Sequence, residues 1–154
     1  MIVVSDTSAI TALLQIGQED LLAELYGTVF IPETVAVELA RSHSQLPSFL
    51  NVVAAKDLDL CRRFQSELDA GEAEAIVLAR EMDADYLLMD ERKGRRVAAR
   101  EGLRVIGLLG VLFDAKERGL LSQLRPVVAE LESKAGFRLS ESVKSHVFRE
   151  AGES

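Results

Sequence analysis

The chain has 154 residues, and 48% of them are hydrophobic, which is enough for one domain with a substantial core. No apolar run approaches the roughly 20 residues that a membrane-spanning helix needs, and no basic leader opens the chain, so we expect a cytoplasmic protein without a membrane partner. The formal net charge of −7 argues against nonspecific coating of DNA, because phosphate binding needs a positive surface.

Short β-rich apolar runs alternate with segments of helical periodicity along almost the whole chain. The predicted strands are residues 2–4, 28–31, 51–55, 86–89 and 104–107. The predicted helices are residues 8–14, 19–25, 33–41, 57–68, 72–80, 95–101, 108–116 and 124–135, with a last one from residue 140. A turn is predicted at residues 69–71. This alternation is typical of an α/β fold in which helices cover a mainly parallel sheet, here of four to five strands.

The chain shows no repeat, low-complexity tract or long linker, so we predict a single domain over residues 1–154. Its helices from about residue 121 carry more apolar side chains than a terminal hairpin needs. These side chains are Leu124, Val128, Leu131, Val143, Val147 and Phe148. We expect the helices to pack on the domain or on a partner, and we predict a homodimer.

The most informative position is Asp6, which follows the first predicted strand and precedes the first predicted helix. In open α/β sheets ligands bind at the carboxyl ends of the strands, so a carboxylate there is well placed for chemistry. Asp is also a preferred residue for capping the N-terminus of a helix. The residue type alone leaves both roles open.

Four further carboxylates lie at comparable positions. Asp90 directly follows a buried strand, as Asp6 does. Glu72 and Glu74 open a helix, where capping explains them equally well, and Glu38 lies at the edge of an apolar stripe. Carboxylates that converge in a cleft repel one another unless a cation neutralises them, and oxygen ligands without His or Cys select Mg²⁺ or Mn²⁺. Phosphoryl chemistry uses such sites to activate a metal-bound water.

A basic run follows the acidic pair at residues 90–91. It consists of Arg92, Lys93, Arg95, Arg96, Arg100 and Arg104. Such a run is either a solvated helix face or a surface that contacts phosphates, and both interpretations stay open. For an RNA substrate, Arg92, Lys93, Arg95 and Arg96 are the residues expected to contact the phosphates.

Four short motifs, taken in chain order, carry a resemblance to a known family. They are Asp6-Thr-Ser8, Ile31-Pro-Glu-Thr-Val-Ala-Val-Glu38, Gly71-Glu-Ala-Glu-Ala-Ile76, and Leu87-Leu-Met-Asp-Glu91 followed by Gly94-Arg95. Together with segments 105–112 and 136–140, they resemble the PIN-domain superfamily, and more narrowly a prokaryotic branch related to VapC-type toxins. The resemblance implies a three-layer α/β/α sandwich and Mg²⁺- or Mn²⁺-dependent endoribonuclease activity on RNA. It also implies, for many members, dimers and pairing with an antitoxin protein.

Carried over residue by residue, the resemblance makes Asp6 the first catalytic acid and Glu38 the second, with Ser8 as the hydroxyl that orients the first. It makes Asp90 the fourth acid, with Glu91 as a substitute. All of these acids would be metal ligands.

The third acid is either Glu72 or Glu74. Residues two apart on a helix point about 200° from each other, so only one of the two faces the cleft. Spacing to Asp90 favours Glu72, whereas the position directly before residues 75–77 favours Glu74, and we choose Glu74.

Two alternatives belong to other classes. A phosphatase of the haloacid type also has an Asp after its first strand, but it needs a second Asp two residues on, where this chain has Ser8. A PIN module that binds RNA or a protein without cleavage is the stronger alternative, because Met89 stands where the family more often has Thr or Ser before its last acid.

Overall fold

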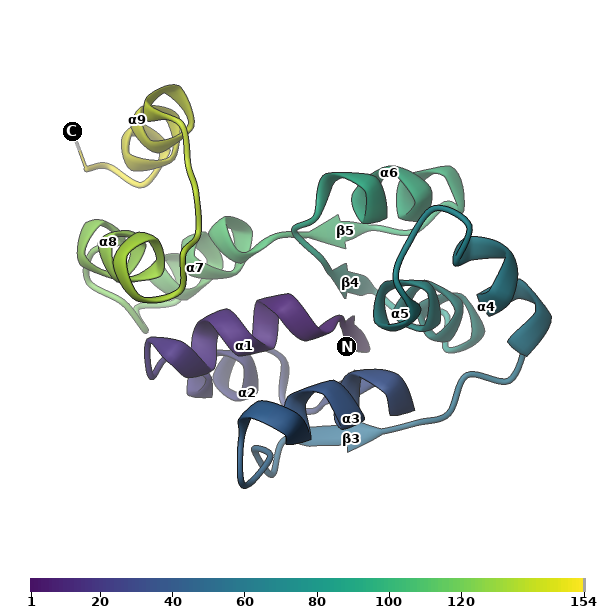
Figure 1. The fold of residues 1–154 in the computed structure, drawn as a ribbon. Helices are drawn as coiled ribbons and strands as arrows, with labels where there is room; N and C mark the ends of the chain where they lie inside the picture. Colours follow the sequence, from purple (N-terminus) through teal and green to yellow (C-terminus); the bar gives the residue numbers. More distant parts are fainter. Residues whose placement is uncertain (154) are drawn as a thin grey trace.

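One parallel sheet forms the middle layer of the protein (Figure 1), whose computed structural model describes residues 1–153. The strands are β1 Val3–Ser5, β2 Val29–Ile31, β3 Leu50–Val52, β4 Tyr86–Leu88 and β5 Val105–Ile106. Their spatial order is β3, β2, β1, β4, β5, and every neighbouring pair is parallel. The predicted parallel sheet is therefore confirmed, although its third strand begins one residue earlier than predicted and ends at Val52 instead of residue 55.

Helices connect and cover these strands. Their bounds are α1 Thr7–Gln15, α2 Asp20–Tyr26, α3 Glu33–Ser42, α4 Leu58–Phe64, α5 Ala70–Glu81, α6 Arg92–Arg100, α7 Leu108–Glu117, α8 Arg125–Lys134 and α9 Glu141–Glu150. No helix among residues 1–153 combines the length and the apolar character that a membrane crossing demands.

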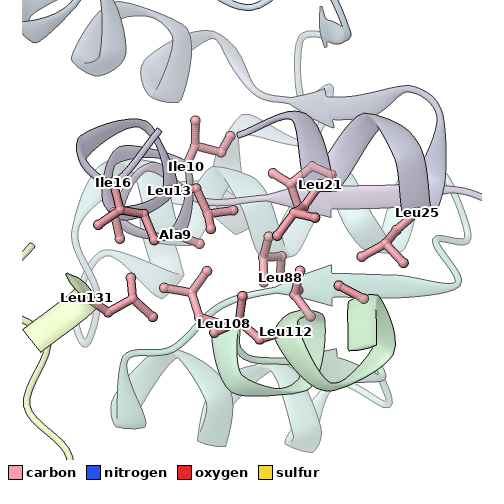
Figure 2. Packing of buried hydrophobic residues seen from close by; sticks show 14 of the residues in the cluster. Ala9, Ile10, Leu13, Ile16, Leu21, Leu25, Leu88, Leu108, Leu112 and Leu131 are labelled. Atoms are coloured by element: carbon pink, nitrogen blue, oxygen red, sulfur yellow. The ribbon is translucent and has the colours of Figure 1, made fainter. Parts of the chain in front are cut away.

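Two apolar cores lie on opposite faces of the sheet, because successive side chains of a strand point to opposite sides. Val3 packs with α1, α2, α7 and α8 on one face, whereas Val4 packs with α4, α5 and α6 on the other. In Figure 2, Leu88 of β4 lies among Leu21, Leu108 and Leu112. Burial of each such leucine contributes about 1.5–3 kcal/mol. The three-layer α/β/α sandwich is thus confirmed.

The start of α5 differs from the prediction. The turn expected at residues 69–71 is wrong, because the helix begins at Ala70 and contains Gly71. Asp69 caps the helix by accepting a hydrogen bond from the Glu72 amide (2.8 Å), and the Glu72 carboxylate accepts one from the Asp69 amide (3.2 Å). This reciprocal capping box fixes the helix start ahead of the glycine.

The start of α6 also lies earlier than predicted, at Arg92 instead of residue 95. Glu91 is the N-cap, and its carboxylate accepts a hydrogen bond from the Lys93 amide at 2.8 Å. The basic run of the sequence is therefore mostly helical, and its exposed side chains lie on the side of α6 opposite the buried Gly94, Val97 and Ala98.

The C-terminal helices add to the core on the α1 face. Four of the six apolar residues behind the homodimer prediction are buried within the chain itself: Leu124, Val128, Leu131 and Phe148. Val143 is 41% exposed and Val147 is half-buried. The chain's own core thus covers the apolar side chains of α8, whereas in α9 it buries only Phe148.

Candidate functional site

The candidate site lies at the carboxyl ends of β1 and β4. These strands are neighbours, and the Asp6 amide donates a hydrogen bond to the Leu88 carbonyl oxygen at 3.3 Å. Asp90 follows Leu88 by two residues. From β1 the chain continues to β2 on one side of the sheet, while β4 lies on the other side. Such a switch in winding direction is where open parallel sheets bind their ligands.

Asp6 is both a helix cap and a buried carboxylate with an unused oxygen. It is 1% exposed, and its Oδ1 accepts a hydrogen bond from the Ala9 amide of α1 at 3.3 Å. Its Oδ2 is buried and has no hydrogen-bond partner among residues 1–153. Burial raises the pKa of Asp6 to about 8; the Ala9 hydrogen bond opposes this rise, and the charges of Asp90 and Glu72 add to it.

Asp90 is held at the start of α7. Both of its carboxylate oxygens lie 3.1 Å from the Leu108 amide, which donates to them. A Cβ on Gly107 would lie only 2.7 Å from Oδ1, so the close approach requires glycine at that position. Burial raises the pKa of Asp90, although the Leu108 hydrogen bond and the charge of Arg95 act in the opposite direction.

Glu38 reaches the site from α3, where it is half-buried. Its Oε1 accepts a hydrogen bond from the Thr7 hydroxyl at 3.1 Å. A Cβ on Gly71 would collide with the same oxygen, so the carboxylate lies against the start of α5. Ser8, to which the family resemblance assigns an orienting role, is exposed. Thr7 instead donates to an acid of the predicted set, and its place beside Asp6 in the sequence was the available signal.

The two glutamates of α5 face different neighbours. The Glu74 carboxylate accepts hydrogen bonds from the Thr34 amide (3.2 Å) and from the Thr34 hydroxyl, and thereby caps the first turn of α3. Glu72 instead contributes to the raised pKa of Asp6. The pKa of Glu72 is itself raised, by burial and by the charges of Asp69 and Glu91, against the effect of its hydrogen bond with the Asp69 amide. The charge of Glu72 thus acts on Asp6, whereas the Glu74 carboxylate is occupied by Thr34 of α3.

The residues around Asp90 have separate tasks. Glu91 is exposed and caps α6. Arg95 donates a hydrogen bond to the Met89 carbonyl oxygen at 3.3 Å and so lies along the β4–α6 connection. Arg92, Lys93 and Arg96 are exposed on α6.

Met89 is a core residue. It is fully buried on the α4–α6 face of the sheet, and a Cβ on Gly94 would lie 3.2 Å from the Met89 Cγ. The methionine thus fills the space that this glycine of α6 leaves. Met89 therefore has a packing role.

The donor chemistry of the site fits a hard divalent cation. The Oδ2 of Asp6 is buried without a hydrogen-bond partner, and burial raises the pKa values of Asp6, Asp90 and Glu72, so a nearby cation would favour the charged forms of these carboxylates. Within residues 1–153, however, no three His, Cys, Asp or Glu side chains are already arranged to hold a metal ion.

Fold and site together define a class: α/β/α sandwiches with acidic side chains gathered at the carboxyl ends of the central parallel strands. A family model described as a PIN domain matches residues 2–153, so the chain belongs to the PIN-domain family. PIN domains are typically nucleases and generally use divalent metals. A search of curated proteins gave no significant match.

Proposed function

We propose that the protein is a metal-dependent endoribonuclease that hydrolyses phosphodiester bonds in RNA. The observation that carries the proposal is the unpartnered Oδ2 of Asp6, buried at the switch point of the sheet in the field of Asp90 and Glu72. Mg²⁺ or Mn²⁺ would be held by Asp6, Glu38, Glu72 and Asp90. Glu72 takes the place of Glu74 in this set, because Glu74 caps α3.

The chain's own residues would prepare the site. Thr7 and Gly71 fix the position of the Glu38 carboxylate, and Leu108 holds that of Asp90. Asp6, with its pKa near 8, retains a proton in much of the population at neutral pH and must release it to act as a ligand. When bound, the ion would supply a water of lowered pKa and offset the charge that builds on the phosphate oxygens.

The decisive experiment incubates the purified protein with RNA and with a labelled DNA oligonucleotide, in Mn²⁺ or in EDTA. We expect Mn²⁺-dependent cleavage of RNA that falls more than about 100-fold in Asp6→Asn and in Asp90→Asn, since even a lost hydrogen-bond partner of a metal ligand typically costs 10- to 100-fold. Asp59→Asn, at an exposed acid of α4, is the matched control. Cleavage that survives both site substitutions would contradict the assignment.

A second candidate is a PIN module that binds RNA or a protein without cleavage. It is favoured by the lack, among the described residues, of three acids already arranged to hold a metal. RNA binding without any cleavage in Mn²⁺ would support this candidate against the nuclease.

We also propose that the protein forms a homodimer or takes up an antitoxin segment through the surface of α7 and α9. An apolar hollow of about 250 Å³ supports this, with Leu109, Phe113 and Val147 among its lining residues. Light scattering at micromolar concentration tests the homodimer. A monomeric mass at that concentration would refute the homodimer.

A further inference from the structure

A stripe of cations runs along one face of α6. The stripe consists of Lys93, Arg96 and Arg100. Arg96 lies three residues and Arg100 seven residues after Lys93, and this spacing places the three side chains on the same side of the helix. All three are exposed, and they line a hollow of about 240 Å³ together with Ser66 and Glu67, which follow α4. The hollow is thus a groove between α6 and the end of α4.

The charge of this groove is unbalanced. Glu67 is its one lining acid, and Glu67 Oε2 lies 3.0 Å from the Arg100 guanidinium. The hydrogen bond and charge of Arg100 lower the pKa of Glu67 against its slight desolvation, and the charges of Arg96 and Lys93 add to this effect. Three cations therefore face one carboxylate. The Arg100 and Glu67 side chains are 57% and 48% exposed, so water weakens this ion pair. Another anion can therefore replace Glu67 at Arg100.

A neighbouring hollow shows the contrast. It has a volume of about 510 Å³ and shares Glu67 and Arg100 with the groove. Its other charged residues balance one another: Arg63 and Arg80 stand with Asp57 and Glu101. Of these two hollows, only the α6 groove therefore has an excess of positive charge.

The groove also has a direction relative to the candidate site. Helix α6 begins two residues after Asp90, and its Arg95 acts on the Asp90 charge, so the stripe starts close to Asp90 and leads away from it. From Lys93 to Arg100 the stripe extends about 10 Å along the helix axis. A chain with regularly spaced negative charges fits this arrangement, and guanidinium groups bind phosphates through paired hydrogen bonds.

We propose that the α6 groove binds the phosphodiester backbone of single-stranded RNA as it leaves the acidic site, and that Glu67 is an internal competitor for Arg100. The inference rests on the proposed function in taking RNA as the substrate. Continuity with the acids at the start of α6 favours RNA over an acidic segment of a protein partner, which the test treats as a separate outcome.

The experiment measures binding of a labelled single-stranded RNA oligonucleotide in EDTA, so that cleavage plays no part. The triple variant K93Q/R96Q/R100Q should bind RNA more weakly. Its salt dependence should also be shallower, by about 0.7 in the slope of log K against log salt for each phosphate that the groove no longer binds. Arg149→Gln removes a cation of α9, far from α6 in Figure 1, and should leave the slope unchanged.

Glu67→Gln provides a test of opposite sign. If Glu67 competes with phosphate, its loss should tighten RNA binding several-fold, whereas a purely structural carboxylate would weaken it or leave it unchanged. Glu130→Gln is the matched control, because it dissolves a similar exposed ion pair with Lys134 (3.2 Å) on α8. Equal effects of the two glutamate substitutions would overturn the competitor role.

The remaining outcomes separate the two proposals. Binding that responds as expected in a protein that cleaves nothing supports the groove and refutes the nuclease. Cleavage of RNA with unaltered binding in the triple variant refutes the groove alone. Groove substitutions that weaken binding of an oligoglutamate peptide but not of RNA would assign the surface to an acidic protein segment instead.

Discussion

The burial of Asp6 makes the protein's stability depend on pH. Because the folded pKa is about 8 and the ordinary value is 3.8, the folded state holds a proton that the unfolded state has released between these two values. The contribution of Asp6 to the free energy of unfolding is therefore greatest below pH 4 and falls as pH rises toward 8. Asn at position 6 carries no titrating group and removes this dependence.

The first prediction concerns this pH dependence of stability. In EDTA, Asp6→Asn should gain melting temperature relative to the wild type as pH is raised from 5 to 8, because only the wild type must ionise a buried carboxyl. Thermal unfolding at several pH values measures the difference, with Asp59→Asn as an exposed control. A difference that does not change with pH would show that Asp6 is already ionised in the folded protein.

The second prediction concerns metal. A ligand that binds only the folded state raises its stability, so Mn²⁺ or Mg²⁺ should raise the melting temperature of the wild type more than that of Asp6→Asn. The gain should be larger at pH 8 than at pH 6, since the ion competes with the proton on Asp6. Equal shifts in both proteins would mean that the metal binds elsewhere.

Gly71 allows a third test at the level of one side chain. An alanine methyl there would collide with Glu38 Oε1, although alanine is otherwise the better helix residue by about 1 kcal/mol. Gly71→Ala should therefore weaken Mn²⁺ binding, measured by titration calorimetry, while the free energy of unfolding in urea stays within about 1 kcal/mol of the wild type. Unchanged metal affinity would exclude Glu38 from the ligand set.

At the level of elements, the sheet could be predicted from sequence because its signals are local. Short apolar runs, each ended by a polar residue, indicated the strands, and Asp6 and Asp90 were placed correctly at strand ends. The choice between Glu72 and Glu74 could not be made in this way. It depends on the packing of α3 against α5, which brings Thr34 to Glu74 across 40 residues of sequence.

Local signals also competed with one another at helix starts. Gly71 favoured a turn, yet the spacing of Asp69 and Glu72 is that of a capping box, and the box prevailed. Glu91 is not among the preferred N-cap residues, which is why the first turn of α6 was missed. Without that first turn, the side of α6 on which the basic side chains lie could not be predicted.

The fourth prediction separates the two glutamates of α5. Glu72→Gln should remove most of the Mn²⁺-induced rise in melting temperature, because this side chain acts on Asp6. Glu74→Gln should lower stability by about 1 kcal/mol through the weakened cap of α3 and leave the metal response intact. The reverse pattern, with the metal response absent only in Glu74→Gln, would restore Glu74 as the third acid.

At the scale of the whole molecule, Glu153, which follows α9, is bonded to the end of α7 and to the start of α8. The Glu153 carboxylate accepts hydrogen bonds from the Leu124 amide (2.7 Å), the Arg125 amide (3.1 Å) and the Lys116 ammonium (2.7 Å). Its side chain is 7% exposed. Arg125 also lies over the Phe148 ring, 4.3 Å from its centre, so α9 is held to α8 at two points.

The fifth prediction tests this attachment. Burial would raise the pKa of Glu153, but the hydrogen bonds from Leu124, Lys116 and Arg125 outweigh it and lower the pKa. The carboxylate therefore stabilises the fold above pH 4.5, and this contribution is lost as pH falls through the folded pKa. Glu153→Gln should cost roughly 1 to 3 kcal/mol in urea unfolding at pH 7 and progressively less below pH 4.5. Glu150→Gln, at an exposed position of α9, should cost little, and equal losses in the two variants would show that Glu153 contributes only a surface charge.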